Sequence, residues 1–126
     1  MLIDDNDADN EFHSRIIRKA DACEHIQVAD SGQKALDYLQ KCGEPGFPKP
    51  DLIFLDINMP KMNGFEFLKE YDKLDAKMKS KIVVFMLTSS LIPEDKDRAM
   101  KGGEVMAFLN KPLTAPKVRE IVDKYF

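Results

Sequence analysis

The stretch PDLIFLDINMPKMNG, residues 50–64, combines an apolar run, an acidic residue and a turn-rich loop. Residues 52–55 are all apolar and follow Pro50, which predicts a short strand buried on both faces, as in a parallel sheet. The run ends at Asp56. Ligands of open α/β sheets bind at the carboxyl edge, so Asp56 is a candidate functional residue. Considered alone, Asp56 fits a turn equally well, because Asp is a favoured turn residue.

The composition is that of one soluble globular domain. The chain has 126 residues, of which 44% are hydrophobic and 33% are charged, and its net charge is -3. This charge argues against nonspecific binding to nucleic acid, and no apolar run approaches the roughly 20 residues of a membrane-spanning helix. Cys23 and Cys42 lack the spacing of a metal or redox motif, so we expect reduced thiols and a cytoplasmic protein. We expect His13 and His25 to be ordinary surface or edge residues.

Strand and helix patterns alternate along the chain. Apolar runs predict strands at residues 1–3, 25–29, 52–55, 82–87 and 106–109. Helical spacing or capping signals follow each run and predict helices after residues 9–10, after 31–32, and at about 65–74, 93–100 and 115–125. This order predicts an α/β fold, with a doubly wound five-stranded parallel sheet and helices on both faces, that is, a (βα)5 flavodoxin-like architecture. We expect residues 1–126 to form one domain, without an output domain.

Two details of this assignment concern the first helix and the longest loop. Asp9 or Asn10 is expected to cap the first helix, which would bury an apolar face made of Phe12, Ile16, Ile17 and Ala20. Residues 43–50 are rich in Gly and Pro and predict a loop.

Polar residues follow four of the five predicted strands, namely Asp4, Asp5, Asp56, Thr88 and Lys111. Because the carboxyl ends of parallel strands share one edge, these side chains should converge there. At 4 Å a pair of carboxylates repel by about 4 kcal/mol at an effective dielectric constant near 20. A divalent cation removes that repulsion, and an all-oxygen ligand set favours Mg²⁺, or Mn²⁺, over zinc. Asp4, Asp5 and Asp56 would bind the metal, with the backbone carbonyl of Asn58 as a further ligand.

A metal beside a carboxylate, with a cation and a hydroxyl opposite, predicts phosphoryl chemistry. Asp56 would be the nucleophile and would form an aspartyl phosphate. Lys111 would supply a compact positive charge, and Thr88 a hydrogen bond. Each residue alone also fits a structural role, as a strand end or a surface residue. Their convergence at one edge is the argument for a site.

Four segments, residues 2–6, 52–64, 84–90 and 108–113, resemble the receiver domain of two-component response regulators in order and spacing. The resemblance implies that Asp56 accepts a phosphoryl group from a phosphohistidine on a sensor histidine kinase or histidine phosphotransfer protein. It implies a phosphoacceptor that catalyses only its own phosphorylation and dephosphorylation. The output surface would be the fourth helix, fifth strand and fifth helix, at about residues 93–125. It would contact a downstream protein effector or form a homodimer, without direct contact to nucleic acid or membrane.

The resemblance also assigns individual roles. Asp4, Asp5, Asp56 and the Asn58 carbonyl would bind Mg²⁺, and Lys111 would contact the phosphoryl group. Thr88 would move toward that group as Phe108 turns inward, and the Lys111–Pro112 bond would be cis. Asn58 and Ser90 occupy positions that influence the lifetime of the phosphoryl group. The chain departs from the family in its short first strand, in Glu104 and in the long loop at 43–50.

Two alternatives belong to other functional classes. A Mg²⁺-dependent phosphatase of the haloacid dehalogenase type also uses a nucleophilic Asp. Its acidic pair comes last in the chain, however, and it has a second Asp where this chain has Asn58. The other alternative is a receiver-like module that binds partners without being phosphorylated. It is disfavoured because every residue of the site is present.

Overall fold

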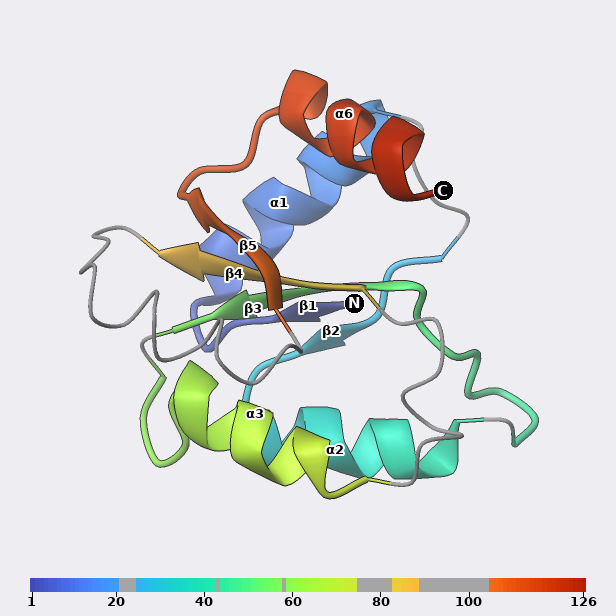
Figure 1. Ribbon diagram of the computed structural model, residues 1–126, viewed down its shortest axis with the longest axis vertical. Helices are drawn as coiled ribbons and strands as arrows, with labels where there is room; N and C mark the ends of the chain where they lie inside the picture. The colour runs from blue at the N-terminus through green and yellow to red at the C-terminus, as the bar shows by residue number, and fades with distance from the viewer. Residues whose placement is uncertain (21–24, 43, 58, 75–82, 89–104) are drawn as a thin grey trace.

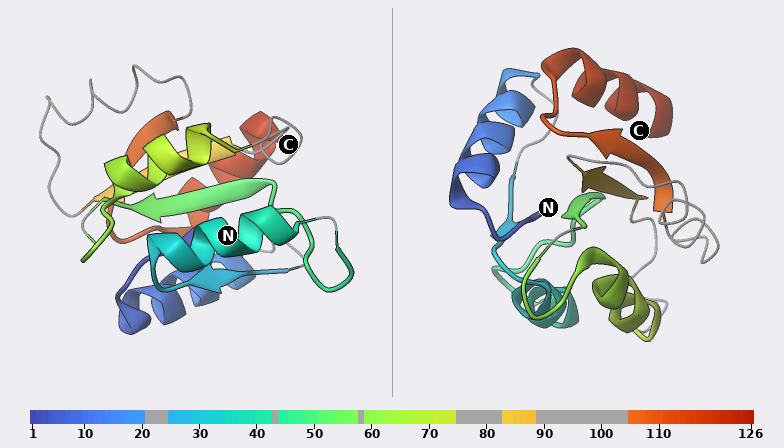
Figure 2. Two further views of the ribbon diagram at one scale, coloured as in Figure 1. Left: turned by 90° about the horizontal axis from the view of Figure 1, so that it is seen from below. Right: turned by 90° about the vertical axis from the view of Figure 1, so that its left-hand side faces the viewer.

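The computed structural model describes residues 1–20, 25–42, 44–57, 59–74, 83–88 and 105–126, apart from the side chains of Val83 and Met106. Within these residues, five parallel strands form one sheet in the order β2-β1-β3-β4-β5. Helices α1 and α6 cover one face and α2 and α3 cover the other (Figures 1 and 2). The predicted doubly wound parallel fold is therefore confirmed. The predicted helix at 93–100 lies outside the described residues.

The strands are β1 (Leu2–Ile3), β2 (Val28–Ala29), β3 (Leu52–Asp56), β4 (Val83–Thr88) and β5 (Val105–Asn110). The helices are α1 (Asp7–Lys19), α2 (Gly32–Lys41), α3 (Gly64–Asp72) and α6 (Ala115–Tyr125). The strand predicted at 25–29 is wrong in extent, because only its last two residues pair with β1. β1 is itself two residues long, so it offers β2 only a short ladder.

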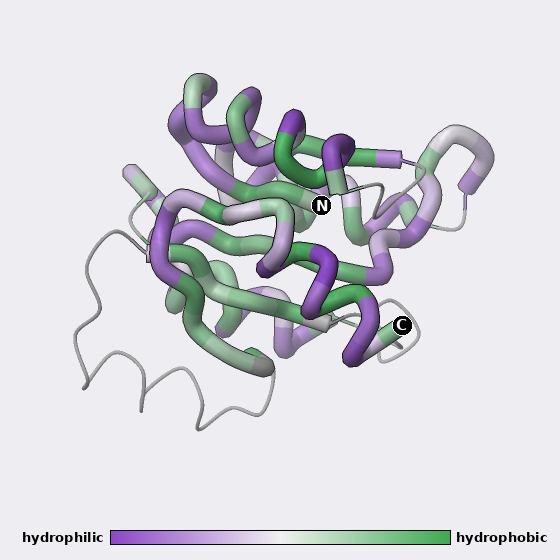
Figure 3. Tube along the Cα trace, turned by 90° about the horizontal axis from the view of Figure 1, so that it is seen from above, coloured by the Kyte–Doolittle hydropathy of each residue, from purple (hydrophilic) through white to green (hydrophobic). Residues whose placement is uncertain are grey.

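Alternate residues of the central strands fill two hydrophobic cores. Ile53 and Leu55 of β3 pack in the core that includes residues of α2 and α3, whereas Phe54 packs in the core that includes residues of α1 and α6. Figure 3 shows the resulting concentration of hydrophobic residues along the strands. Burying one such side chain contributes about 1.5–3 kcal/mol, so the apolar run of β3 stabilises both layers.

Helix α1 begins three or four residues earlier than the sequence suggested. Its N-cap is Asn6, whose side chain accepts a hydrogen bond from the backbone N–H of Asp9. The predicted cap at Asp9 or Asn10 is therefore wrong. The earlier start fits Asn6, a preferred capping residue, with Asp7 and Asp9 in the first turn, where carboxylates interact favourably with the helix dipole.

The predicted apolar face of α1 is confirmed at Ile17 and Ala20, which are buried, and is wrong at Phe12. Its buried residues are Asn10, His13, Ser14 and Ile17, and Phe12 is 45% exposed. His13 is only 2% exposed, so the expected surface position is wrong. Because this face packs beside the polar ends of the strands, polar side chains replace apolar ones in the first half of the helix.

The loop after Asp56 approaches the end of β3 closely. The backbone N–H of Gly64 donates to the carbonyl of Ile57 at 2.8 Å. A Cβ atom at Gly64 would lie 2.8 Å from the carbonyl oxygen of Asp56 and 3.0 Å from Cα of Ile57. Asn63 and Glu66 then form a capping box that begins α3. Only glycine fits where α3 meets the candidate site.

Candidate functional site

Three carboxylates meet at the carboxyl edge of β1 and β3. Ile3 pairs with Leu55, so the residues that follow them, Asp4 and Asp56, lie side by side. One carboxylate oxygen each of Asp4, Asp5 and Asp56 lies within 4.8 Å of the other two. Asp4 and Asp56 are 3% and 5% exposed, whereas Asp5 is exposed to solvent. The parallel register thus produces the acidic group that the strand pattern predicted.

Lys111 supplies the positive charge of this edge. Its Nζ lies 2.7 Å from Oδ2 of Asp4, 3.0 Å from Oδ2 of Asp9 and 3.1 Å from Oδ1 of Asp56. Its backbone N–H donates to the carbonyl of Thr88 at 2.8 Å, which ties the end of β5 to the end of β4. The Lys111–Pro112 peptide bond is cis, as the resemblance implied. The ammonium is therefore surrounded by three carboxylates.

Burial and neighbouring charges shift the pKa values of Asp56 and Lys111. Burial raises the pKa of Asp56, and the neighbouring Asp4 raises it further, against the opposing effect of Lys111. Burial opposes the charge of Lys111, but hydrogen bonds to Asp4, Asp9 and Asp56 outweigh it and raise the Lys111 pKa. The ammonium therefore stays charged, and Asp56 is more basic than an exposed carboxylate.

Thr88 and Phe108 are the remaining predicted site residues that the structure describes. Thr88 ends β4 and is 1% exposed. Phe108 of β5 is partly buried and packs against the core that includes residues of α2 and α3. Met86 of β4 pairs with Phe108, two positions before Thr88 pairs with Asn110, so β4 and β5 link the two positions. Asn58, Ser90 and Glu104 lie outside the described residues.

Three residues of α1 adjoin the site although the sequence did not suggest them. Asp9 contacts Lys111, and the Nδ2 of Asn10 donates to the backbone carbonyl of Asp4 at 2.8 Å. His13 lies close enough to the charged groups that they affect its protonation. Burial lowers the His13 pKa, and Asp9 partly offsets this. With the cap placed at Asn6, helical spacing would have put Asn10 and His13 on one face.

The ligand chemistry of the carboxylate group fits a hard divalent cation. Its donors are all oxygens, two of them from buried side chains and one from a side chain that reaches solvent. Magnesium is usually held by one or two carboxylates together with water and substrate oxygens, and manganese accepts the same ligands. The residues present are therefore suitable for Mg²⁺ or Mn²⁺.

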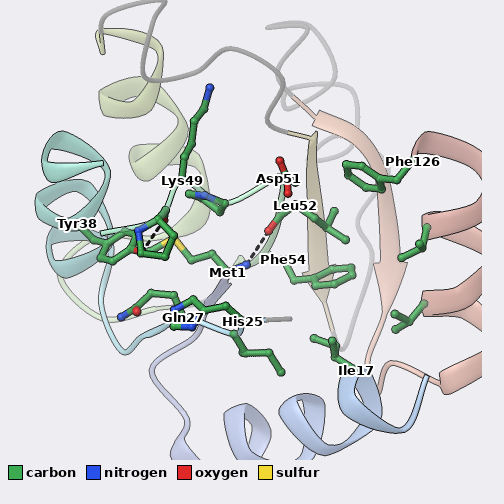
Figure 4. Close-up of a pocket in the computed structure, with 15 residues that line it drawn as sticks. Met1, Ile17, His25, Gln27, Tyr38, Lys49, Asp51, Leu52, Phe54 and Phe126 are labelled. Atoms are coloured by element: carbon green, nitrogen blue, oxygen red, sulfur yellow. Dashed lines mark hydrogen bonds between the residues drawn. The ribbon is translucent and has the colours of Figure 1, made fainter. Parts of the chain in front are cut away.

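A pocket of about 440 Å³ lies elsewhere, at the amino edge of the sheet (Figure 4). Met1, Leu52, Phe54 and residues 25–27 are among the residues that line it. The amino group of Met1 donates a hydrogen bond to the carbonyl of Leu52 at 2.6 Å. Its lining is largely apolar and includes none of the candidate site residues.

Helices of the described part of the chain are too short or too polar to cross a bilayer.

Known proteins support the assignment that the geometry suggests. Residues 1–123 match the model of the response regulator receiver domain. The chain is 33% identical over 129 residues to the two-component response regulator ARR5 of Arabidopsis thaliana, covering 98% of this chain and 67% of that protein. It is 27% identical to the hybrid signal transduction histidine kinase L of Dictyostelium discoideum, but spans only 7% of the length of that protein.

Solved structures are similar to this chain in both fold and sequence. A two-component response regulator from Cytophaga hutchinsonii is 36% identical, with a TM-score of 0.88 over 98% of this chain and 92% of that one. The Mn²⁺-bound form of the response regulator Rcp1 is 27% identical, with a TM-score of 0.72 over 98% and 87% of the two chains. The family match favours the receiver interpretation over the phosphatase alternative. The chain belongs to the response regulator receiver domain family of two-component systems.

Proposed function

We propose that Asp56 accepts a phosphoryl group with Mg²⁺ bound at Asp4, Asp5 and Asp56. The observation that carries this proposal is the placement of the Asp56 carboxylate, within 4.8 Å of two other carboxylates and 3.1 Å from the Lys111 ammonium. The Mn²⁺-bound Rcp1 structure supports a divalent cation in a related protein. We extend the ligand set to the Asn58 carbonyl by resemblance.

The phosphodonor would be a phosphohistidine on a sensor histidine kinase or a histidine phosphotransfer protein. A carboxylate oxygen of Asp56 attacks phosphorus, the P–N bond of the donor breaks, and the imidazole leaves with the bonding electrons and takes up a proton. A bound Mg²⁺ would neutralise charge on the phosphoryl oxygens. Burial makes Asp56 a more basic carboxylate and hence a stronger nucleophile when it is ionised.

Lys111 and Thr88 stabilise the phosphoryl group in this proposal. The Lys111 ammonium lies beside the attacking oxygen and faces the negative charge that the transfer brings to the site. The Thr88 hydroxyl donates a hydrogen bond. The domain remains a phosphoacceptor, and its only catalysis is its own phosphorylation and the later hydrolysis of the aspartyl phosphate by water.

Phosphorylation would change the conformation of Thr88 on β4 and of Phe108 on β5, and so the surface that partners contact. Thr88 moves toward the phosphoryl group and Phe108 turns inward, which changes the surface formed by β5, α6 and the helix that the sequence predicts at 93–100. That surface contacts a downstream protein effector or a second copy of the chain, and the protein works in the cytoplasm. The pairing of Met86 with Phe108 and of Thr88 with Asn110 supports a link between the two switch positions.

The test is incubation with acetyl phosphate and Mg²⁺, followed by mass spectrometry of the intact protein. Wild type should gain the mass of one phosphoryl group, and the gain should disappear when EDTA replaces Mg²⁺. Asp56→Asn should gain nothing, whereas Asp51→Asn, an exposed carboxylate before the same strand, should be modified like wild type. An unmodified wild type, or an Asp56→Asn variant modified equally, would contradict the proposal. Continuous release of phosphate from many small substrates would instead indicate a phosphatase.

A further inference from the structure

Helix α1 brings a fourth carboxylate, Asp9, to the candidate phosphorylation site. Its Oδ2 accepts a hydrogen bond from Lys111 Nζ at 3.0 Å, and it does not belong to the group of three carboxylates suited to a metal. We propose that Asp9 is a positioning residue, which holds the Lys111 ammonium beside Asp56 when a metal and a phosphoryl group occupy the other carboxylates. The inference rests on the proposed function of Asp56.

The hydrogen bonds of Lys111 lead to this inference. An ammonium has three N–H donors. Lys111 donates hydrogen bonds to Asp4 and Asp9 and forms an ion pair with Asp56 at 3.1 Å. Asp4 and Asp56 both belong to the group that can bind a cation. A metal or a bond to phosphorus takes part of their acceptor capacity and negative charge, which weakens their attraction for Lys111. Of the three contacting carboxylates, Asp9 is then the one that keeps its full charge for the ammonium.

Two hydrogen bonds, one made by Asp9 itself and one made by the next residue, fix the position of Asp9. Its backbone N–H donates to the Asn6 side chain at 3.0 Å, in the N-cap of α1. The next residue, Asn10, is 5% exposed and donates from Nδ2 to the carbonyl of Asp4 at 2.8 Å. The first turn of α1 is thus tied to the end of β1, so Asp9 stays in place if the Asp4 carboxylate turns toward a metal.

Lys111 needs such an anchor because its side chain is long and flexible. Lysine carries a compact charge on four methylene groups, and every rotamer that turns it toward solvent removes it from the phosphoryl group. Its side chain is 16% exposed, so solvent is within reach. Asp9 lies on the more open side, with a side chain that is 39% exposed. A carboxylate there limits the ammonium to orientations that face Asp56.

The experiment measures the rate constant for phosphorylation by acetyl phosphate at saturating Mg²⁺. Asp9→Ala should lower it about five- to tenfold, since a misplaced catalytic group costs up to about 100-fold. Asp9→Asn keeps an acceptor oxygen and should recover part of the rate. Asp7→Ala is the matched control, because it removes an exposed carboxylate from the same helical turn, and it should change the rate less than about twofold.

A double-mutant cycle identifies Lys111 as the group through which Asp9 acts. In a Lys111→Ala background, Asp9→Ala should change the rate less than about twofold, because no ammonium remains to be positioned. An equal slowing in both backgrounds would overturn the inference. So would a slowing by Asp7→Ala as large as that by Asp9→Ala, or a faster rate in Asp9→Ala.

A second readout does not depend on phosphorylation. Hydrogen exchange of the Lys111 ammonium, followed by ¹⁵N NMR with Mg²⁺ present and assigned by its loss in Lys111→Ala, should accelerate in Asp9→Ala and not in Asp7→Ala. Unchanged exchange would overturn the role of Asp9 even if wild type is phosphorylated. An unphosphorylated wild type with accelerated exchange in Asp9→Ala would contradict the proposed function while supporting the contact.

Discussion

The ammonium of Lys111 lies 3.1 Å from Oδ1 of Asp56, although β4 separates β3, which ends at Asp56, from β5, which Lys111 follows. The lysine side chain is long enough to cross that strand, and the bond from its backbone N–H to Thr88 fixes where it begins. One cation thereby offsets part of the charge of Asp4, Asp9 and Asp56. The balance between this ion pairing and carboxylate repulsion determines how the site responds to mutation, pH and metal.

Replacing Asp56 by Asn should stabilise the metal-free protein at neutral pH. The pKa of Asp56 is raised above its ordinary value of 3.8, so the native state binds the proton more tightly than the unfolded state. The contribution of Asp56 to stability is therefore greatest below its ordinary, unfolded-state pKa and is lost as pH rises through its raised pKa in the folded protein. We expect Asp56→Asn to gain on the order of 1 kcal/mol at pH about 7 and little at pH about 4.

Urea denaturation in EDTA at the two pH values measures this difference. Asp123→Asn, an exposed position on α6, is the control and should stay within about 0.5 kcal/mol of wild type at both. A loss of stability in Asp56→Asn at neutral pH would mean that the bond to Lys111 outweighs burial and repulsion by Asp4.

Removing the Lys111 side chain should destabilise the metal-free protein and increase the benefit of Mg²⁺. Lys111→Ala leaves buried carboxylates without their cation, and breaking a buried pair in this way costs about 3 kcal/mol. Added Mg²⁺ should recover more stability than in wild type, because no ammonium competes for the carboxylates. Thermal denaturation with Mg²⁺ or EDTA tests this.

Lys117→Ala is the matched control for that measurement. Its ammonium lies 3.7 Å from Glu120 on the exposed face of α6, and such surface pairs contribute at most about 1 kcal/mol. Equal effects of Mg²⁺ on wild type and on Lys111→Ala would show that the ammonium and the metal do not share ligands.

Gly64→Ala should destabilise the fold through the backbone of the site. Its Cβ would meet the Asp56 carbonyl at 2.8 Å and Ile57 Cα at 3.0 Å, and overpacking of this kind costs about 1–3 kcal/mol. Gly32→Ala, at the start of α2, would meet only the side chain of Met62, which can move. Equilibrium unfolding should therefore separate the two variants, and equal stabilities would contradict the close approach at Gly64.

Asn6→Ala should weaken the first turn of α1. It removes the acceptor for the backbone N–H of Asp9, and loss of an Asn cap costs about 1 kcal/mol. Asn6→Gly should cost only a few tenths of a kcal/mol, because glycine is also a good N-cap. Urea denaturation compares them, and faster amide exchange at Asp9 in Asn6→Ala would place the loss at the cap. Equal stability of Asn6→Ala and wild type would exclude this role.

The arrangement of the strands follows from the sequence because the relevant signals are local. Apolar runs such as residues 52–55 identify buried strands, and alternation with helical patterns makes the sheet parallel. A parallel sheet brings its carboxyl ends together, so Asp4, Asp56 and Lys111 could be assigned to one site before any distance was known. The strand at 25–29 was overestimated because pairing length depends on its partner, β1, and not on its own apolar residues.

Only the tertiary structure decided which residues of α1 join that site. The start of the helix depends on which of several adjacent polar residues serves as the cap, and the buried face depends on what the helix packs against. Packing of α1 against the strand ends buries Asn10 and His13, and its early start at Asp7 brings Asp9 to Lys111, a contact between residues at opposite ends of the chain. The sequence determined which chemical groups meet at the sheet edge, whereas packing of α1 determined which carboxylates share the Lys111 ammonium.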